Sequence, residues 1–218
     1  MSRPSTSAVF DLDCRRCPRL SAFLDQVGQA HPDYHARPVA PFGADDPGLL
    51  VVGLAPGMHG ANASGRPFTG DHAGILLYQT LHAFGFASAP QSRAADDGLR
   101  LLDCRITNAV KCLPPQNKPI GEEIRTCNAF LQAELAGLRE GAVVLALGSI
   151  AHQAVLRAFG LKLKDHPFGH DVLHALPGGR HLLASYHCSR YNTQTRRLTE
   201  AMFHAVFARA RGLLDGHG

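Results

Sequence analysis

Residues 49–54 read LLVVGL, and residues 142–148 read AVVLALG. Both are continuous apolar runs that meet glycine within a few residues, which is the pattern of a strand buried on both faces of a parallel sheet. Two further runs resemble them, LDCRITNAV (102–110) and HLLASYH (181–187). Segments with helical spacing lie between and after these runs, at residues 73–86, 122–138, 149–159 and 196–214.

This alternation of strands and helices predicts an α/β fold, a three-layer α/β/α arrangement around a central, mostly parallel four-stranded sheet. Ligands of such folds bind at the carboxyl ends of the strands, so the strand ends are the candidates for chemistry. They carry the loop after Gly53, then Asn108, Gly148 and His187. Two polar or proline-rich stretches are predicted loops, residues 30–46 and 87–97.

The length of 218 residues favours a single domain over residues 1–218, and neither long loop resembles a domain linker. The net charge of +4 permits a polyanionic partner without identifying one. Arg190, Arg196 and Arg197 follow the last strand end and are candidate phosphate contacts. The N-terminus has no apolar segment typical of a secretion signal, and no run is long enough to span a membrane. We therefore expect a cytoplasmic protein without membrane association.

The loop after the first strand reads GLAPGMHGANASGRPFTGD (53–71) and holds five glycines. Glycine lets backbone N–H groups approach an anion, although an ordinary connection between a strand and a helix would have the same composition. The lysine of a phosphate-binding loop and the GxGxxG pattern are missing, so nucleoside triphosphate and dinucleotide sites are not predicted. Phe68 and Asp71 add a ring and a carboxylate, which suit a flat, electron-poor ligand.

Six cysteines without a secretion signal argue against a disulfide framework. Cys14 and Cys17 form a CxxC pair, while Cys112 and Cys127 lie much later with fourteen residues between them. Four thiolates could hold zinc or an iron–sulfur cluster. The spacing matches neither a zinc ribbon nor a ferredoxin, so from spacing alone the metal stays open.

Three stretches together resemble the motifs of the uracil-DNA glycosylase superfamily, and most closely its family 5, also called type B. They are residues 53–71, ITNAVKCLPPQNKP (106–119) and SYHCSRYNTQTRRLT (185–199). The similarity runs from residue 14 to about residue 202, and the four cysteines match those that hold a 4Fe–4S cluster in families 4 and 5. The resemblance implies a monofunctional DNA glycosylase that hydrolyses the N-glycosidic bond of uracil in double-stranded or single-stranded DNA and thereby initiates base excision repair.

The resemblance also assigns roles to the strand-end residues. Asn108 would donate its amide N–H to O4 of a flipped uracil and accept from N3–H, a pairing that cytosine cannot make. His187 would stabilise the negative charge on the leaving base at O2, either as a neutral donor or as a cation. Phe68 would stack on the base. The remaining predicted substrate-binding residues are Gly53, Ala55 and Gly57.

This chain differs from the better-known branches of the superfamily in the position of the predicted catalytic carboxylate. Those branches place a polar residue directly after the first motif glycine, whereas this chain has Leu54 and Ala55. In family 5 the role passes to Asp71, which would either position water or stabilise a positively charged sugar. The predicted catalytic residues are therefore Asp71, Asn108 and His187.

Gly57 stands where the uracil-specific family has a tyrosine that excludes the methyl group of thymine. Its lack of a side chain predicts a roomier site. Hypoxanthine also presents a carbonyl acceptor beside a ring N–H donor, so Asn108 could accept it. The hypothesis is therefore a broad activity on deaminated bases, with hypoxanthine, xanthine and thymine opposite guanine as further candidates.

The segment after His187 is predicted to contact DNA through Ser189, Arg190, Tyr191 and Asn192. Related sequences often have proline after the histidine, which is replaced here, so the residue that fills the gap left by the flipped base is not set by the motif. Tyr191 is our candidate because an aromatic ring can stack between neighbouring bases. A surface tyrosine packed on its loop is the alternative.

Two other classes of protein remain to be weighed. A lesion-binding or crosslinking member of the superfamily would use the same cavity without hydrolysis, but Asp71 and His187 together favour catalysis. A hydrolase of small nucleotides would show no preference for DNA. Lys111 lies three residues after Asn108, so a Schiff-base mechanism needs a direct test. We expect a monomer.

Overall fold

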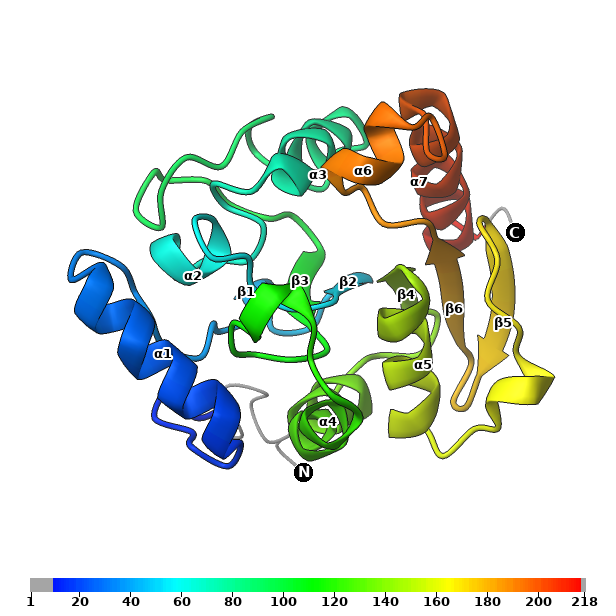
Figure 1. The fold of residues 1–218 in the computed structure, drawn as a ribbon. Helices are drawn as coiled ribbons and strands as arrows, with labels where there is room; N and C mark the ends of the chain where they lie inside the picture. The colour runs from blue at the N-terminus through cyan, green and yellow to red at the C-terminus, as the bar shows by residue number, and fades with distance from the viewer. Residues whose placement is uncertain (1–9, 217–218) are drawn as a thin grey trace.

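The computed structural model describes residues 10–216. Residues 1–9 and 217–218 of the predicted domain 1–218 therefore lie outside the described residues, and so does most of the N-terminal stretch in which no secretion signal was predicted. Figure 1 shows a central sheet with helices on both faces. The strands are β1 (Phe42–Gly43), β2 (Leu49–Gly53), β3 (Cys104–Asn108), β4 (Val143–Leu147), β5 (Val172–Leu176) and β6 (Arg180–Ser185). The predicted α/β fold is confirmed.

The helices lie between these strands and after the last of them. They are α1 (Pro18–Ala30), α2 (Ala61–Ser64), α3 (His72–Ala83), α4 (Gly121–Ala136), α5 (Ser149–Ala158), α6 (Arg190–Gln194) and α7 (Glu200–Leu214), with 3₁₀ turns at Pro115–Asn117 and Leu163–Asp165. Among residues 10–216, no helix combines the length and the apolar character needed to cross a membrane.

The prediction of four strands was wrong in number, because the sheet has six in the order β1-β3-β2-β4-β6-β5. The four predicted strands form its centre and pair in parallel. The two missed strands, β1 and β5, pair antiparallel at the edges. β1 has only two residues, and β5 is mostly half-buried, so neither has the continuous apolar run that marks a central strand.

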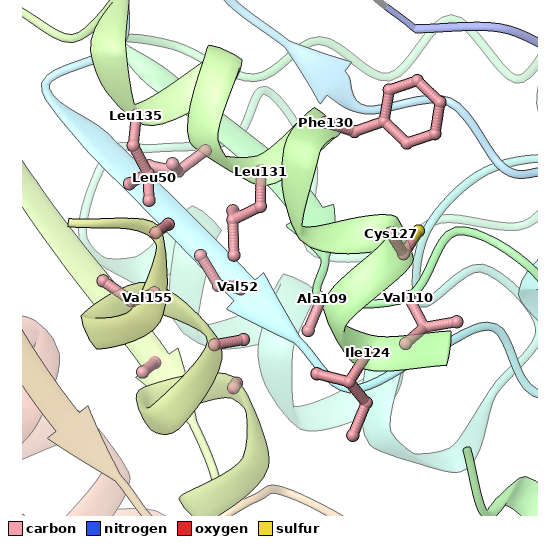
Figure 2. Close-up of a cluster of buried hydrophobic side chains, with 14 of the residues drawn as sticks. Leu50, Val52, Ala109, Val110, Ile124, Cys127, Phe130, Leu131, Leu135 and Val155 are labelled. Carbon is pink, nitrogen blue, oxygen red and sulfur yellow. The ribbon is translucent and has the colours of Figure 1, made fainter. Parts of the chain in front are cut away.

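Alternate residues of the central strands point to opposite faces and fill two separate cores. Leu50 and Val52 of β2 pack with residues of α4 and α5, as Figure 2 shows with Leu131 and Val155. Leu49 and Val51 belong to the other core, with residues of α3 and α7. Burial of apolar surface on both faces fixes the helices in layers on either side of the sheet.

The strand order places a topological switch point at β2. The chain runs from β2 through α3 to β3 on one side, and β4 then pairs on the other side of β2. Gly53 pairs with Asn108, and Leu147 pairs with Ser185, so the parallel strands end level with each other. The segments that follow these strands therefore converge at one edge, where open α/β sheets bind ligands.

A buried ion pair joins the segment after β3 to α4. Lys111 Nζ lies 2.5 Å from Glu134 Oε1, and the two residues are 1% and 5% exposed. The hydroxyl of Thr107, on β3, donates to the same carboxylate at 3.1 Å and accepts from the lysine. The pair therefore supports the strand that carries Asn108.

Candidate active site

A cavity of about 450 Å³ lies at the carboxyl edge of the parallel strands. All three predicted catalytic residues, Asp71, Asn108 and His187, contribute to its lining. The lining also contains three predicted substrate-binding residues, Ala55, Gly57 and Phe68. Side chains from three separate segments of the chain thus face one cavity, as the convergence of strand ends predicts.

Gly53, the last residue of β2, is a predicted substrate-binding residue that does not itself line the cavity, but it lies against two residues that do. A Cβ at this position would lie 2.4 Å from Asn108 Oδ1 and 2.7 Å from Phe68 Cζ, so a side chain cannot be accommodated without moving both. Phe68 itself has a φ of 58°, an unusual value for a bulky residue. Its carbonyl packs against Gly74 of α3, where a Cβ would be 1.8 Å from the oxygen. The ring is therefore held by a backbone packed on the first turn of α3.

Asn108 ends β3 and is 3% exposed. Its Oδ1 atom is buried and has no hydrogen-bond partner among the described residues. An unpaired buried amide oxygen costs about 1–3 kcal/mol, so residues rarely keep such an atom without a ligand for it. The carbonyl oxygen of this amide is thus suited to accept a hydrogen bond from a molecule in the cavity.

His187 lies two residues beyond β6, and its ring is tilted only 24° from that of Phe68, with the centroids 6.0 Å apart. Its Nδ1 is buried and has no partner among the described residues. Burial lowers the pKa of His187 to about 4. Of the two protonation states that the sequence left open, burial favours the neutral ring at neutral pH.

Asp71 precedes α3, but its carboxylate does not cap that helix. It turns instead toward the start of α2, where the backbone N–H of Ala61 donates to Oδ2 at 3.2 Å and the N–H of Gly57 also donates. Burial raises the pKa of Asp71 above its ordinary value, and these two hydrogen bonds partly oppose the rise. The carboxylate is therefore both desolvated and fixed.

Two glycines make room for this carboxylate. A Cβ on Gly57 would lie 2.3 Å from Asp71 Oδ1, and a Cβ on Gly60 would lie 2.0 Å from the same atom. The absence of a side chain at Gly57, which the sequence associated with a roomier site, thus makes room for the carboxylate of Asp71.

Four lining residues were not among the predicted site residues: Leu54, His72, Ala73 and Asn117. Asn117 lies in the second motif, which was the one available signal for it. Its φ of 56° is a conformation that asparagine tolerates better than most residues. His72 directly follows Asp71, and no pattern in the sequence distinguished it.

The segment after His187 forms α6, and its four predicted DNA-binding residues differ in their surroundings. Ser189 Oγ accepts from the N–H of Asn192 at 3.4 Å and caps the helix. The Asn192 side chain donates to the carbonyl of His187 at 2.8 Å. Arg190 lines the cavity, and Tyr191 is 70% exposed. Asn192 therefore supports the backbone of His187, while the side chains of Arg190 and Tyr191 are exposed to a ligand.

The four predicted metal ligands, Cys14, Cys17, Cys112 and Cys127, line one small cavity between α1, α4 and the segment after β3. Burial raises the pKa of Cys17 to about 11 and that of Cys112 to about 12. Within the described part of the chain, no three His, Cys, Asp or Glu side chains are close enough to hold a single metal ion. The thiols are neighbours, but they are not arranged as a tight mononuclear site.

Comparison with known proteins agrees with this geometry. The family model described as the uracil DNA glycosylase superfamily matches residues 40–211, which include the whole cavity. The chain belongs to this superfamily.

Individual relatives show which branch of the superfamily the chain is most similar to. A type-5 uracil-DNA glycosylase of Thermus thermophilus is 51% identical over 205 residues, which cover 92% of this chain and 93% of that protein. A type-5 uracil-DNA glycosylase of Mycobacterium leprae is 43% identical over 208 residues, or 92% and 91% of the two chains. A type-4 uracil-DNA glycosylase of Archaeoglobus fulgidus is 36% identical over 115 residues, which cover only 52% of this chain and 50% of that protein. The resemblance to family 5 is confirmed.

Lys111, three residues after Asn108, does not line the active-site cavity. It lines the cavity of the thiols, and its amine is paired with Glu134. Among the described residues that line the active-site cavity, none is a lysine.

Proposed function

We propose that this protein is a type-5 uracil-DNA glycosylase, a hydrolase that cleaves the N-glycosyl bond of uracil in DNA and so begins base excision repair. The observation that supports this most strongly is the buried Asn108 amide, whose oxygen has no partner among the described residues, in one cavity with Asp71 and His187. The 51% identity to a type-5 enzyme over almost the entire chain supports the same conclusion.

Recognition of the base begins at Asn108. Its amide N–H donates to O4 of uracil, and Oδ1 accepts from N3–H. Cytosine offers a donor and an acceptor in the reverse places, so the buried amide would lose both hydrogen bonds. Such a mismatch in a site built for hydrogen bonding gives strong discrimination, because the polar groups stay unpaired and desolvated.

Departure of the base is assisted by His187 and Phe68. The neutral imidazole donates a hydrogen bond to O2 as negative charge develops on the base, and Phe68 stacks on the ring face. A neutral donor stabilises the anion without requiring a buried cation in the resting enzyme, which matches the lowered pKa of His187.

Asp71 supplies the negative charge that the sugar needs as its bond to the base breaks. Among the described residues that line the cavity, it is the one carboxylate. Held by backbone N–H groups, it faces the reacting centre without large reorganisation, and it can also orient the attacking water. No lysine is among the described residues that line the cavity, which supports water as the nucleophile and a monofunctional enzyme.

We propose that the substrates extend beyond uracil. The cavity of about 450 Å³ is within the range of small-molecule sites and is not confined to the smallest base. Hypoxanthine presents the acceptor and donor pair that Asn108 requires. Xanthine and thymine opposite guanine are further candidates.

The uracil activity and the broader specificity can be tested with one panel of single-stranded and double-stranded oligonucleotides. Each carries one uracil, hypoxanthine, xanthine or mispaired thymine. We expect fastest release of uracil, measurable release of hypoxanthine, and none of cytosine. Activity confined to uracil would contradict the broad specificity. A duplex that is bound but never converted to an abasic site would instead identify a lesion-binding protein, and a product linked to the protein would identify a crosslinking one. Borohydride should trap no covalent complex.

DNA itself would lie over α6. Tyr191, exposed beside the cavity, is the residue we propose to enter the stack of bases, and Arg190 is placed to meet a phosphate at the cavity rim. We propose that the enzyme acts as a monomer in the cytoplasm, bound to the nucleoid when it engages DNA.

We further propose that Cys14, Cys17, Cys112 and Cys127 hold a 4Fe–4S cluster. Their fit rests on the cavity that the four thiols share. A cluster offers a separate iron to each thiolate, so it allows a wider spacing than tetrahedral zinc. When bound, the cluster would serve as a cross-link between α1, α4 and the segment that follows Asn108.

Metal analysis of protein purified without oxygen tests the cluster. We expect iron and acid-labile sulfide in equal amounts and an absorption band in the blue region of the spectrum. Cys112→Ser should lose most of the iron, whereas Cys104→Ser, a buried cysteine outside this cavity, should retain it. Zinc in place of iron, or equal iron in both variants, would contradict the proposal.

The pH dependence of base release follows from the two catalytic groups. Burial raises the pKa of Asp71, so its carboxylate is lost at a higher pH than that of a free aspartate, while His187 stays neutral until the pH nears 4. The single-turnover rate should therefore be constant around neutral pH and fall in acid, as Asp71 is protonated. A rate that increased on acidification would indicate a cationic His187. Asp71→Asn should abolish the acid limb, and His187→Gln should retain it.

A further inference from the structure

A second hollow of about 460 Å³ lies beside the active-site cavity. The two share four lining residues, Phe68, Asp71, His72 and Arg190. They are therefore adjacent along a common rim.

The chemistry of the second hollow differs from that of the first. Its floor includes Ile75 and Gln79 of α3, and its outer wall is the loop from Pro90 to Arg93. Ile75 is 57% exposed, which is unusual for a large apolar side chain, and the lining cations Arg93 and Arg190 are both exposed. An apolar surface, side-chain amides and arginines together suit a nucleotide, which has a flat base and an anionic phosphate.

The loop that forms the outer wall is fixed from within. Arg66 is 5% exposed, and its guanidinium donates to Asp97 Oδ1 at 2.6 Å, to Ser92 Oγ at 3.0 Å and to a backbone carbonyl of the same loop. Thr69 Oγ1 lies 2.6 Å from Ser92 Oγ. Because Arg66 and Thr69 belong to the loop that carries Phe68 and Asp71, the wall is fastened to the active site itself.

We propose that this hollow binds the nucleotide adjacent to the damaged one in the same DNA strand. The inference rests on the proposed glycosylase function. When a base enters the active-site cavity, its own sugar and phosphates remain at the rim, beside His72 and Arg190. The neighbouring nucleotide then meets the second hollow, where its base packs on Ile75 and its phosphate meets Arg93. The volume is sufficient for one nucleotide.

Shortened substrates test this assignment. Uracil is placed in single-stranded oligonucleotides with both flanks, without nucleotides on its 5′ side, or without nucleotides on its 3′ side. For the wild type we expect kcat/KM to fall about tenfold when one particular side is removed, the effect of roughly one stacked base. In the double variant Ile75→Ala, Arg93→Gln, removal of the same flank should lower kcat/KM by no more than about twofold. The variant already lacks the side chains that this flank would contact, so the two losses are not additive.

Arg100→Gln is the matched control. It removes the same charge from an exposed arginine near the loop but outside both hollows, so the full tenfold loss should persist. Thermal melting of each variant confirms that the comparison is between folded proteins.

Each remaining result contradicts one proposal and not the other. A wild type that ignores both flanks, or a double variant that suffers the same loss on truncation, overturns the nucleotide subsite. A loss that appears only when the same shortened strands are paired in a duplex, and not in the single strands, would assign the hollow to the complementary strand and overturn it too. Inactivity on every uracil substrate overturns the glycosylase. The subsite is then decided by fluorescence anisotropy with the same truncations around a non-cleavable abasic analogue.

Discussion

Replacing Asp71 by asparagine should slow base release by roughly 10²–10³-fold in single-turnover experiments, while binding of a uracil-containing duplex changes little. Asparagine has the same shape but lacks the charge that stabilises a sugar cation. Among the described residues that line the cavity, no other carboxylate can replace it. A rate within tenfold of the wild type would show that Asp71 is not the catalytic carboxylate.

A glycine variant separates the charge of Asp71 from its position. Gly60→Ala retains the carboxylate but places a Cβ 2.0 Å from Oδ1, so the side chain must move. Misplacement of a catalytic group by about 1 Å can cost 10²-fold, and we expect a loss of that order. Gly212→Ala is the control, because outside the adjacent residues and backbone of its own helix no atom lies within 4 Å of the added Cβ. Equal activity of the two glycine variants would contradict a fixed carboxylate.

Breaking the buried pair between Lys111 and Glu134 should destabilise the protein by about 3–5 kcal/mol, because either single substitution leaves a charge buried without its partner. Both Glu134→Gln and Lys111→Met should show this loss in urea unfolding. The corresponding fall in melting temperature is roughly 10 °C for a chain of this size. Any iron bound at the proposed cluster site must be equal in all samples.

The double variant Lys111→Met, Glu134→Leu distinguishes the charge from the packing. It removes both buried ions together, and well-packed apolar replacements of such pairs are often neutral or stabilising. We expect it to recover most of the stability that each single variant loses. A double variant as unstable as the sum of the singles would mean that the loss comes from packing around Thr107 and not from an unpaired charge.

The central fold could be predicted because its strands are buried on both faces. β2 and β4 are continuous apolar runs, and a run of this kind has few stable places outside a parallel sheet covered by helices. The edge strands lack that constraint. β5 is largely half-buried and pairs only with β6, so its composition matches a loop as well as a strand. Local pattern therefore predicts the interior of the sheet better than its edges.

The meeting of the candidate catalytic residues could be predicted for a related reason. Asn108 ends one buried strand and His187 follows another, and parallel strands must end at the same edge, so their meeting is a consequence of the fold class. Asp71 was identified by the resemblance of its motif. The way in which it is held, by the N–H groups of Gly57 and Ala61, depends on how the loop folds back on itself and has no signal in the spacing of residues.

By itself, the sequence determined the α/β class, the edge of the sheet where the candidate site lies and the residues that meet there, because hydrophobic runs and motif order are local properties of the chain. The tertiary structure alone decided the long-range side-chain contacts. These are the ion pairs of Arg66 with Asp97 and of Lys111 with Glu134, and the near-parallel rings of Phe68 and His187. Such contacts join residues far apart in sequence. Their strength depends on burial and distance, which exist only once the chain has folded.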